Sequence, residues 1–334
     1  MTESTIGELE YRGVAYRRAG RSGLLLPTFA LGLWHSFGEQ HDRRTQAGLI
    51  TGAFDRGITH FDNANRYGPP HGHAETVLGD VLGRELRAHR DEITVSTKAG
   101  NQVAPHPYGS GSSRRHLFAE IDRSLTRLGL DHVDVFYSHR HDPVTPLEET
   151  AQALADIVRQ GKARYLGLSN YPPEALHTIA DLLRGLGTPA ALVQPRYSLL
   201  DRTIERPGHL LELADRHGFG IVVYSPLAQG LLTDKYLTGE IPEDARAGRS
   251  EFLGTDFLTD DYVQRTRAFA RLAESEGATT PQLALRWILR QQAVASVLLG
   301  VSKPEQLDVN LASAQLPEPS TELLAQLDEL YPNS

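Results

Sequence analysis

The stretch Ile58-Thr-His-Phe-Asp62-Asn-Ala-Asn-Arg-Tyr67 decides which fold and which chemistry are expected of this chain. Its first four residues are typical of a short buried strand, Asp62 stands where that strand ends, and Tyr67 follows on the exiting loop. Two further apolar runs, 93–97 and 133–138, end in the same way at Lys98 and His139. In a parallel barrel the carboxyl ends of the strands converge on one face. The pattern therefore predicts that an acid, a phenol, an amine and an imidazole meet there.

Composition narrows the class of protein. The chain has 334 residues, 40% of them hydrophobic, which suits either one large α/β barrel or two ordinary domains. Its net charge of −8 argues against binding nucleic acid or anionic membranes, and the absence of cysteine excludes disulfides and thiolate chemistry. The first residues lack the apolar core of a signal peptide, and no apolar run reaches the roughly 18 residues of a membrane span. A cytoplasmic protein without nucleic-acid or membrane partners is expected.

Strands and helices alternate along the chain, which predicts a parallel sheet. Eight strands are predicted, at 29–34, 58–61, 93–97, 133–137, 163–168, 190–193, 220–224 and 296–299. Eight such units in roughly 300 residues favour a closed barrel over an open sheet. The open, doubly wound alternative requires a Gly-x-Gly-x-x-Gly turn, and both Gly109-Ser-Gly111 and Gly218-Phe-Gly220 lack the third glycine.

The predicted fold class is therefore α/β, a single (β/α)8 TIM barrel domain over residues 1–334. A β-hairpin at 11–27 precedes the barrel, a long polar segment at 231–258 interrupts it, and extra helices at 304–314 and 320–330 follow the last strand. Asp42 is expected to N-cap the first helix. Pro146 is expected to open the helix after the fourth strand, because proline suits the first helical position.

The four groups at the strand ends suit one reaction. A free phenol has a pKa of about 10, and Lys98 beside Tyr67 is expected to lower that pKa. Asp62 would keep Lys98 charged, and His139 could hydrogen-bond a substrate carbonyl. A proton donor aimed at a carbonyl oxygen fits the reduction of an aldehyde or ketone, where general acid catalysis contributes roughly 100- to 10,000-fold. No side chain carries a hydride, so a cofactor must supply it.

Several motifs give the chain a resemblance to a known family. They are Gly57–Asp62 with Tyr67-Gly68, Ser96–Lys98, Ser138–Arg140, Gly167–Asn170, Gln194-Pro195, Tyr224–Leu227 and Leu298–Ser302. Over nearly its whole length the chain resembles the aldo-keto reductases. Within that family, the stretches 61–70, 107–114 and 137–140 look like those of the bacterial L-glyceraldehyde 3-phosphate reductases, which are relatives of the potassium-channel β subunits. The family implies an NADPH-dependent carbonyl reductase on a (β/α)8 barrel.

The resemblance implies roles for individual residues. Asp62, Tyr67, Lys98 and His139 match the catalytic tetrad, with Tyr67 as the acid. The matches around the nicotinamide and pyrophosphate are Ser169, Asn170 and Gln194 for the carboxamide, Tyr224 for stacking on the ring, and Ser225, Pro226, Leu227, Gln229 and Gly230 in the covering loop. The matches near the adenosine and its phosphates are Lys235, Arg246, Gly300, Ser302, Gln306 and Asn310. Val309 departs from the channel subunits, which carry a carboxylate there that contacts the adenine.

Two positions border the expected substrate. Trp34 ends the first strand and is expected to wall the pocket, in contact with both substrate and cofactor, whereas Trp287 lies in a helical apolar pattern typical of core. Arg140 either contacts the substrate or supports the barrel rim. The resemblance implies small aldehydes, such as glyceraldehyde 3-phosphate or methylglyoxal, and a homotetramer or homo-octamer.

Charge bears on the choice of cofactor. A 2′-phosphate needs cations, and Lys303 and Arg246 offer them. Arg246 lies in the segment 231–258, which is expected to cover the cofactor. No acidic residue is placed to hold a ribose 2′-hydroxyl, so NADP(H) is expected rather than NAD.

Other interpretations stay open. The chain could be an NADP(H)-binding sensor subunit like the channel β subunits, with only incidental turnover, although those carry asparagine at the place of His139. It could also be a metal-dependent hydrolase, with His139, His141 and Asp142 as ligands. The pair His71 and His73 resembles a metal-binding pair, but both are expected to be loop residues, and no metal is expected.

Two turns also have alternative interpretations. The turn Gly109–Ser113, followed by Arg114, could bind an anion such as a substrate phosphate through its backbone amides. It could equally be a flexible turn in which a serine caps the next helix. Ser225-Pro226 could simply start a helix.

Overall fold

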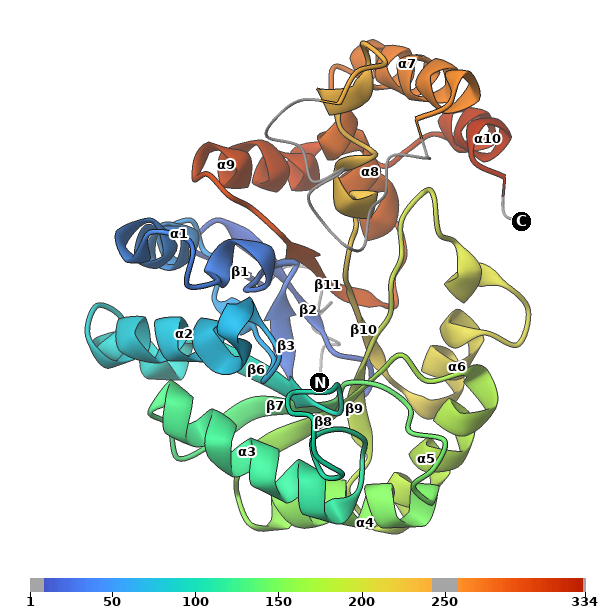
Figure 1. The fold of residues 1–334 in the computed structure, drawn as a ribbon. Helices are drawn as coiled ribbons and strands as arrows, with labels where there is room; N and C mark the ends of the chain where they lie inside the picture. Colours follow the sequence, from blue (N-terminus) through green and yellow to red (C-terminus); the bar gives the residue numbers. More distant parts are fainter. Residues whose placement is uncertain (1–8, 242–257, 333–334) are drawn as a thin grey trace, which may run out of the picture.

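Eight parallel strands close into a barrel in the computed structural model, which describes residues 9–241 and 258–332 (Figure 1). The strands are β4 (Phe29–Gly32), β5 (His60–Asp62), β6 (Thr94–Ala99), β7 (Val133–Ser138), β8 (Ala163–Ser169), β9 (Ala190–Gln194), β10 (Gly220–Val223) and β11 (Val294–Leu299). Each pairs with the next along the chain, and β11 pairs with β4 to close the ring. The predicted (β/α)8 barrel is therefore confirmed.

Helices surround the strands as an outer ring (Figure 1). They are α1 (Arg43–Asp55), α2 (His73–Gly83), α3 (Arg114–Leu128), α4 (Leu147–Arg159), α5 (Pro173–Gly185), α6 (Leu210–His217), α7 (Asp260–Ser275), α8 (Thr280–Leu289), α9 (Glu305–Leu311) and α10 (Thr321–Leu330). Asp42 caps α1 as predicted, its carboxylate accepting from the Thr45 backbone at 2.8 Å. Pro146 is the N-cap of α4 rather than its first residue.

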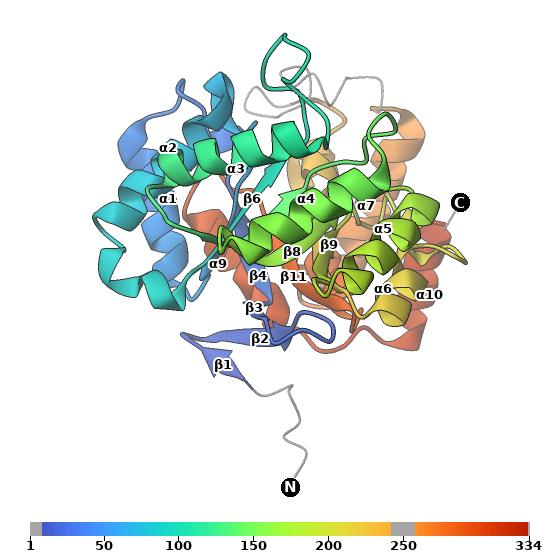
Figure 2. The same ribbon diagram turned by 90° about the horizontal axis from the view of Figure 1, so that it is seen from below.

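A small antiparallel sheet closes one end of the barrel. It comprises β1 (Glu10–Tyr11), β2 (Val14–Arg18) and β3 (Leu25–Pro27), so the predicted hairpin is β2 with β3, extended by a third strand. Figure 2 shows the sheet at the end away from the loop that follows β6. At Gly20, with φ +55°, a Cβ atom would meet the Gly218 carbonyl at 2.1 Å, so the sheet abuts the start of β10. The opposite end, where the strands finish, is left for a site.

The core has two parts. One lies between the strands and the helices and includes Trp287, which is fully buried as predicted. The other fills the barrel interior near the N-terminal sheet and includes Leu26, Tyr137 and Val222. A side chain at Gly167 would overlap the Tyr137 ring at 2.2 Å, so this glycine makes room for the ring. No helix among the described residues has both the length and the apolar character to cross a membrane.

Candidate active site

A buried ion pair forms the base of the site. Lys98 Nζ, from the end of β6, donates to Asp62 Oδ2 at 2.5 Å and to the Asn63 carbonyl at 2.7 Å. Both charged side chains are excluded from solvent. A buried charge is tolerated when it is paired and its remaining hydrogen bonds are satisfied, and the Asn63 carbonyl supplies one of those bonds to Lys98.

The second carboxylate oxygen of Asp62, Oδ1, accepts two hydrogen bonds of its own. Ser96 donates its hydroxyl to Asp62 Oδ1 at 2.7 Å, and Gln194 donates its amide to the same oxygen at 3.0 Å. Ser96 and Lys98 are two residues apart on β6, so their side chains leave the strand on the same face. Asp62 is thereby fixed in orientation before any ligand arrives.

Tyr67 lies above this pair. Its hydroxyl is 3.4 Å from Lys98 Nζ, and its ring stands edge-on to His139 with the ring centroids 5.9 Å apart. The Trp34 ring stacks on the Tyr67 ring, also with the centroids 5.9 Å apart. The residue after the tyrosine, Gly68, has φ +70°, and a Cβ there would meet the Phe37 carbonyl at 2.4 Å. The loop after β5 can therefore place Tyr67 here only with glycine at position 68.

Electrostatics keep Tyr67 protonated. Burial raises the pKa of the phenol well above 10, and the charge of Asp62 adds to the rise. Burial likewise lowers the pKa of Lys98, while Asp62 opposes that fall. The expectation that Lys98 would bring the Tyr67 pKa below 10 is therefore wrong, because the cost of an anion in this buried place outweighs the ammonium 3.4 Å away. A phenol that keeps its proton near pH 7 is available as a donor.

His139 is neutral in this setting. Burial lowers its pKa well below the usual range for histidine, and the charge of Lys98 lowers it further. Arg66 and Arg140, which flank Tyr67 and His139 in the sequence, act on the His139 pKa in the same direction. Both guanidinium groups are exposed, and neither forms an ion pair within the described residues. The mouth of the site therefore carries two cations.

A second set of polar residues joins this group. Asn170, with φ +54°, donates its amide to the His139 carbonyl and to Ser169 Oγ, each at 2.9 Å. It also accepts from the Tyr224 hydroxyl at 2.9 Å. Gln194 bridges the two sets because it reaches Asp62. Amide donors and acceptors beside a half-buried tyrosine ring fit a flat carboxamide-bearing ring such as nicotinamide.

The loop after β10 begins in unusual backbone geometry. Ser225, Ala228 and Gln229 have φ of +54°, +46° and +59°, and Gly230 has φ +100°. Left-handed non-glycine residues cost free energy and gather at ligand-binding sites. Pro226 and Leu227 lie within the same turn, which does not continue as a helix beyond the three residues Ala228–Gly230. The alternative that Ser225-Pro226 starts a regular helix is wrong.

The residues expected at the adenosine end lie after β11. Gln306 accepts from the Ser302 backbone at 2.8 Å and from the Lys303 backbone at 3.3 Å, which orders this turn. Asn310 is buried, whereas Val309 and Gly300 are exposed. Lys235 is exposed on a short turn, Asp234–Tyr236, and Arg246 lies outside the described residues.

Comparison with known proteins assigns the family. The model of the Aldo/keto reductase family matches residues 28–332. The chain belongs to the aldo/keto reductase family. It is 46% identical over 323 residues to the L-glyceraldehyde 3-phosphate reductase of Escherichia coli strain K12, covering 96% of this chain and 93% of that protein. It is also 36% identical to a putative voltage-gated potassium channel subunit beta of Schizosaccharomyces pombe, covering 96% of this chain and 94% of that one.

The aldo/keto reductase assignment makes the chain an oxidoreductase that uses a nicotinamide cofactor. Some of its site residues were missed from sequence. Ser96 and the Asn63 carbonyl hold the Asp62–Lys98 pair, and Arg66 adds charge at the mouth. The position of Ser96 two residues before Lys98 on one strand is a signal that could have found it. A backbone carbonyl leaves no such signal.

The turn before α3 of the reductase does not suit an anion. The Ser112 amide donates to the Asp142 carboxylate at 2.9 Å, and the Arg114 amide donates to Glu149 at 3.0 Å. Ser113 caps the helix through the His116 amide. Two carboxylates already hold these amides, so the structure favours the capped turn over a phosphate site.

The histidines near the site, His71, His73 and His141, each contact a different partner. His71 shares a hydrogen bond with the Arg66 carbonyl at 3.1 Å. His73 begins α2 rather than lying in the loop, and its ring is 3.5 Å from Arg43. Asp142 is held by Ser112 and Thr145, while the His141 ring packs on Tyr171 at 5.3 Å. These contacts hold the loops, and the start of α2, in place.

A cavity of about 370 Å³ adjoins the site. Its lining includes Asn170, Gln194 and Tyr224 together with apolar residues such as Leu176 and Ile204. None of the four tetrad residues lines it. The cavity therefore lies beside these four residues and does not contain them.

Proposed function

We propose that this aldo/keto reductase reduces small aldehydes with NADPH, and that Tyr67 donates the proton. The observation that carries the proposal is the Tyr67 hydroxyl 3.4 Å from Lys98 Nζ, with Lys98 itself bound to Asp62. The whole chain, 1–334, would act as one domain, with the segment 231–258, of which 242–257 lie outside the described residues, covering the cofactor. A homo-oligomer is part of this proposal and is tested by light scattering.

Each residue has a distinct task in the proposed reaction. NADPH, when bound, supplies the hydride to the carbonyl carbon. His139, neutral and edge-on to Tyr67, donates a hydrogen bond to the carbonyl oxygen and so orients it. Tyr67 passes its proton to that oxygen as negative charge develops there. Lys98 stabilises the phenolate that remains, and Asp62 holds Lys98 charged in the buried pocket.

The cofactor would be held along the face already described. Ser169, Asn170 and Gln194 would bind the carboxamide, and Tyr224 would stack on the ring. The covering loop would enclose the pyrophosphate, where left-handed backbone at Ser225 and Ala228 turns the chain. Lys303 is an exposed cation without an ion-pair partner among the described residues, which supports NADP over NAD.

Charge at the mouth supports a phosphorylated or otherwise anionic aldehyde. Arg66 and Arg140 lie close enough to His139 to lower its pKa. A relative is named L-glyceraldehyde 3-phosphate reductase, so glyceraldehyde 3-phosphate is the first substrate to test, with uncharged methylglyoxal beside it.

The decisive experiment compares the native enzyme with Tyr67→Phe, following NADPH consumption with a panel of small aldehydes. The substitution keeps the ring and removes the proton, so turnover should fall about 100-fold or more while NADPH affinity is retained. Tyr11→Phe, at an exposed tyrosine of the N-terminal sheet that closes the opposite end of the barrel, is the matched control and should keep full activity. Equal activity of Tyr67→Phe and the native enzyme would remove Tyr67 as the acid.

A second candidate is an NADP(H) sensor subunit, which the likeness to a protein named as a potassium channel subunit favours. The same assay separates the two. Tight NADPH binding with no turnover of any aldehyde by the native protein would support the sensor.

A further inference from the structure

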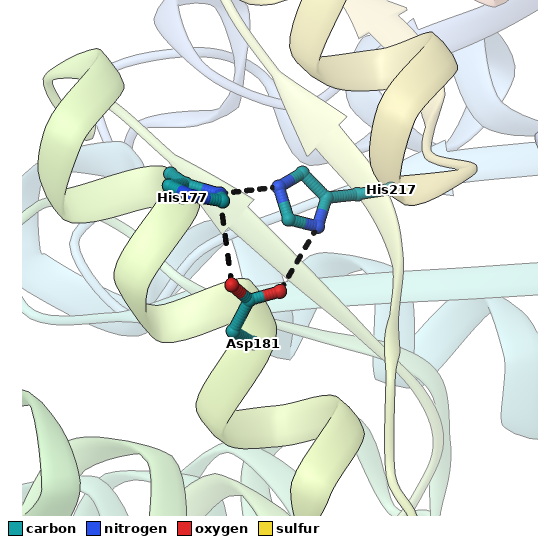
Figure 3. Close-up of side chains that lie close together, drawn as sticks. All are labelled: His177, Asp181 and His217. Atoms are coloured by element: carbon teal, nitrogen blue, oxygen red, sulfur yellow. Dashed lines mark hydrogen bonds and ion pairs between the residues drawn. The ribbon is translucent and has the colours of Figure 1, made fainter.

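Two histidines and an aspartate meet on helices of the outer ring (Figure 3). His177 and Asp181 lie one turn apart on α5, so both side chains leave the same side of that helix. His217 is the last residue of α6 and faces them. The three side chains therefore join two neighbouring helices.

The distances are close to those of a metal centre. His177 Nδ1 is 2.8 Å from His217 Nε2 and 3.8 Å from Asp181 Oδ2. One ligand atom from each residue lies within 4.8 Å of the others. His217 is buried, and its ring stacks on Phe219 at 5.3 Å, so one of the three groups is already held in place.

We propose that His177, Asp181 and His217 bind a divalent transition-metal ion such as Zn²⁺. The ligand atoms would be His177 Nδ1, His217 Nε2 and Asp181 Oδ2, with solvent completing the coordination. Imidazole and carboxylate are ordinary ligands of zinc, and zinc sites with three protein ligands keep an open position. Bonds of about 2.0–2.1 Å at a tetrahedral angle separate two nitrogens by about 3.3 Å. The two imidazoles would move apart by about 0.5 Å, and the partly exposed His177 can do so.

The second ring nitrogen of His217 has neighbours of its own. With Nε2 on the metal, Nδ1 of His217 would carry the ring proton, and it lies 3.7 Å from Asp181 Oδ1 and 3.5 Å from Arg184 Nη2. The carboxylate is too far from Nδ1 for a hydrogen bond, so the ring is oriented by its stacking on Phe219.

Two guanidinium groups oppose the metal. Arg184 donates to the His217 carbonyl at 3.0 Å and lies 3.9 Å from Asp181 Oδ1, and Arg216 adds a more distant charge. The Arg184 side chain is half exposed, so solvent screens it and it can turn toward the outer carboxylate oxygen. The bond to the His217 carbonyl also ties Arg184 to the end of α6.

The bound ion would act as a brace between α5 and α6. It touches none of the residues assigned to the reaction, so it should change stability and leave turnover unchanged. A ligand that binds only the folded state raises the melting temperature. This role is independent of the proposed reduction.

The test is calorimetric titration of the metal-stripped, full-length protein with ZnCl₂. The native chain should bind one equivalent, and His177→Ala and Asp181→Asn should each weaken binding by about tenfold or more. Asp181 is exposed, so Asp181→Asn keeps the fold if His177→Ala does not. His41→Ala, at an exposed histidine outside the cluster, is the control and should bind like the native chain.

A second readout is the melting temperature, which saturating zinc should raise by a few degrees in the native chain and in His41→Ala only. Absence of binding by the native chain would overturn the proposal. So would equal binding by both cluster variants, because the zinc would then sit elsewhere.

Discussion

Lys98 Nζ lies 2.5 Å from Asp62 Oδ2 in a place from which both side chains are excluded from solvent. Neither charge is stable there alone, because the desolvation cost of each is offset by the other. The pair also lies next to the proposed proton donor, since the Tyr67 hydroxyl is 3.4 Å from the same ammonium. Stability and catalysis are therefore predicted to fail together when the pair is broken.

Asp62→Asn tests this coupling. The change keeps the shape and leaves Lys98 as a buried cation without its counter-charge, so the free energy of unfolding should fall by about 3–5 kcal/mol. Turnover should fall as well, because the pKa of Lys98, already lowered by burial, would drop further. Urea unfolding and NADPH consumption measure the two effects.

A control variant and a double-mutant cycle test this explanation. Asp308→Asn breaks an exposed pair with Arg56 and should leave stability nearly unchanged. Adding Lys98→Met to Asp62→Asn removes the stranded cation, so the double variant should lose less stability than the sum of the single variants. Additive losses would mean that the pair is not coupled.

The backbone that places Tyr67 can be tested at Gly68. Gly68→Ala forces a side chain onto φ +70° and against the Phe37 carbonyl, so we expect a loss of about 1–3 kcal/mol and a large fall in turnover. Gly83→Ala is the matched control, because that glycine lies in α2 with no atom within 4 Å of the new methyl group. It should be neutral or slightly stabilising. Equal behaviour of the two variants would remove the steric argument.

The pH dependence of stability has a predicted sign. Burial lowers the pKa of His60 to about 4, with Lys98 adding to the fall and Asp62 opposing it. The pKa of His60 in the folded state is below the unfolded value of about 6.5. The stability that depends on a neutral His60 is therefore fully present above pH 6.5 and is lost as pH falls toward 4. At that pH the free energy of unfolding should have fallen by about 3 kcal/mol because of this residue. Urea unfolding at several pH values measures it.

His60→Gln isolates that contribution. The variant loses the titrating group, so its stability should change less between pH 7 and pH 4.5 than that of the native chain. An unchanged slope would assign the acid sensitivity to other groups, such as His139, whose pKa is also lowered by burial.

The sequence predicted most of the fold because buried parallel strands form continuous apolar runs. The meeting of Asp62, Lys98 and His139 followed from their places at strand ends. The sequence did not predict where the short helix α6 begins and ends, because its eight residues make only about two turns and give too little periodicity. The direction of the Tyr67 pKa was wrong because burial is a property of the packed structure, which spacing does not reveal. Contacts of backbone groups, such as the Asn63 carbonyl, were hidden for the same reason.

The two cations at the mouth predict a charge-dependent choice of substrate. Arg66 and Arg140 are exposed and lower the pKa of His139, so both lie within electrostatic reach of a bound aldehyde. Replacing each with methionine should raise KM for glyceraldehyde 3-phosphate about tenfold or more, with little change for methylglyoxal, since only the phosphate loses its partners. Added salt should weaken the binding of glyceraldehyde 3-phosphate to the native enzyme and leave that of methylglyoxal nearly unchanged.

Arg115→Met is the matched control for that comparison. Arg115 lies in the first turn of α3, and its guanidinium is 3.6 Å from the centroid of the Tyr108 ring, which is on the loop that follows β6. It is not among the charges that act on the pKa of His139. The control should therefore treat both aldehydes as the native enzyme does. If Arg66→Met and Arg140→Met lost activity equally with charged and uncharged aldehydes, the arginines would be supports of the barrel rim. A loss confined to glyceraldehyde 3-phosphate would instead identify them as the groups that bind its phosphate.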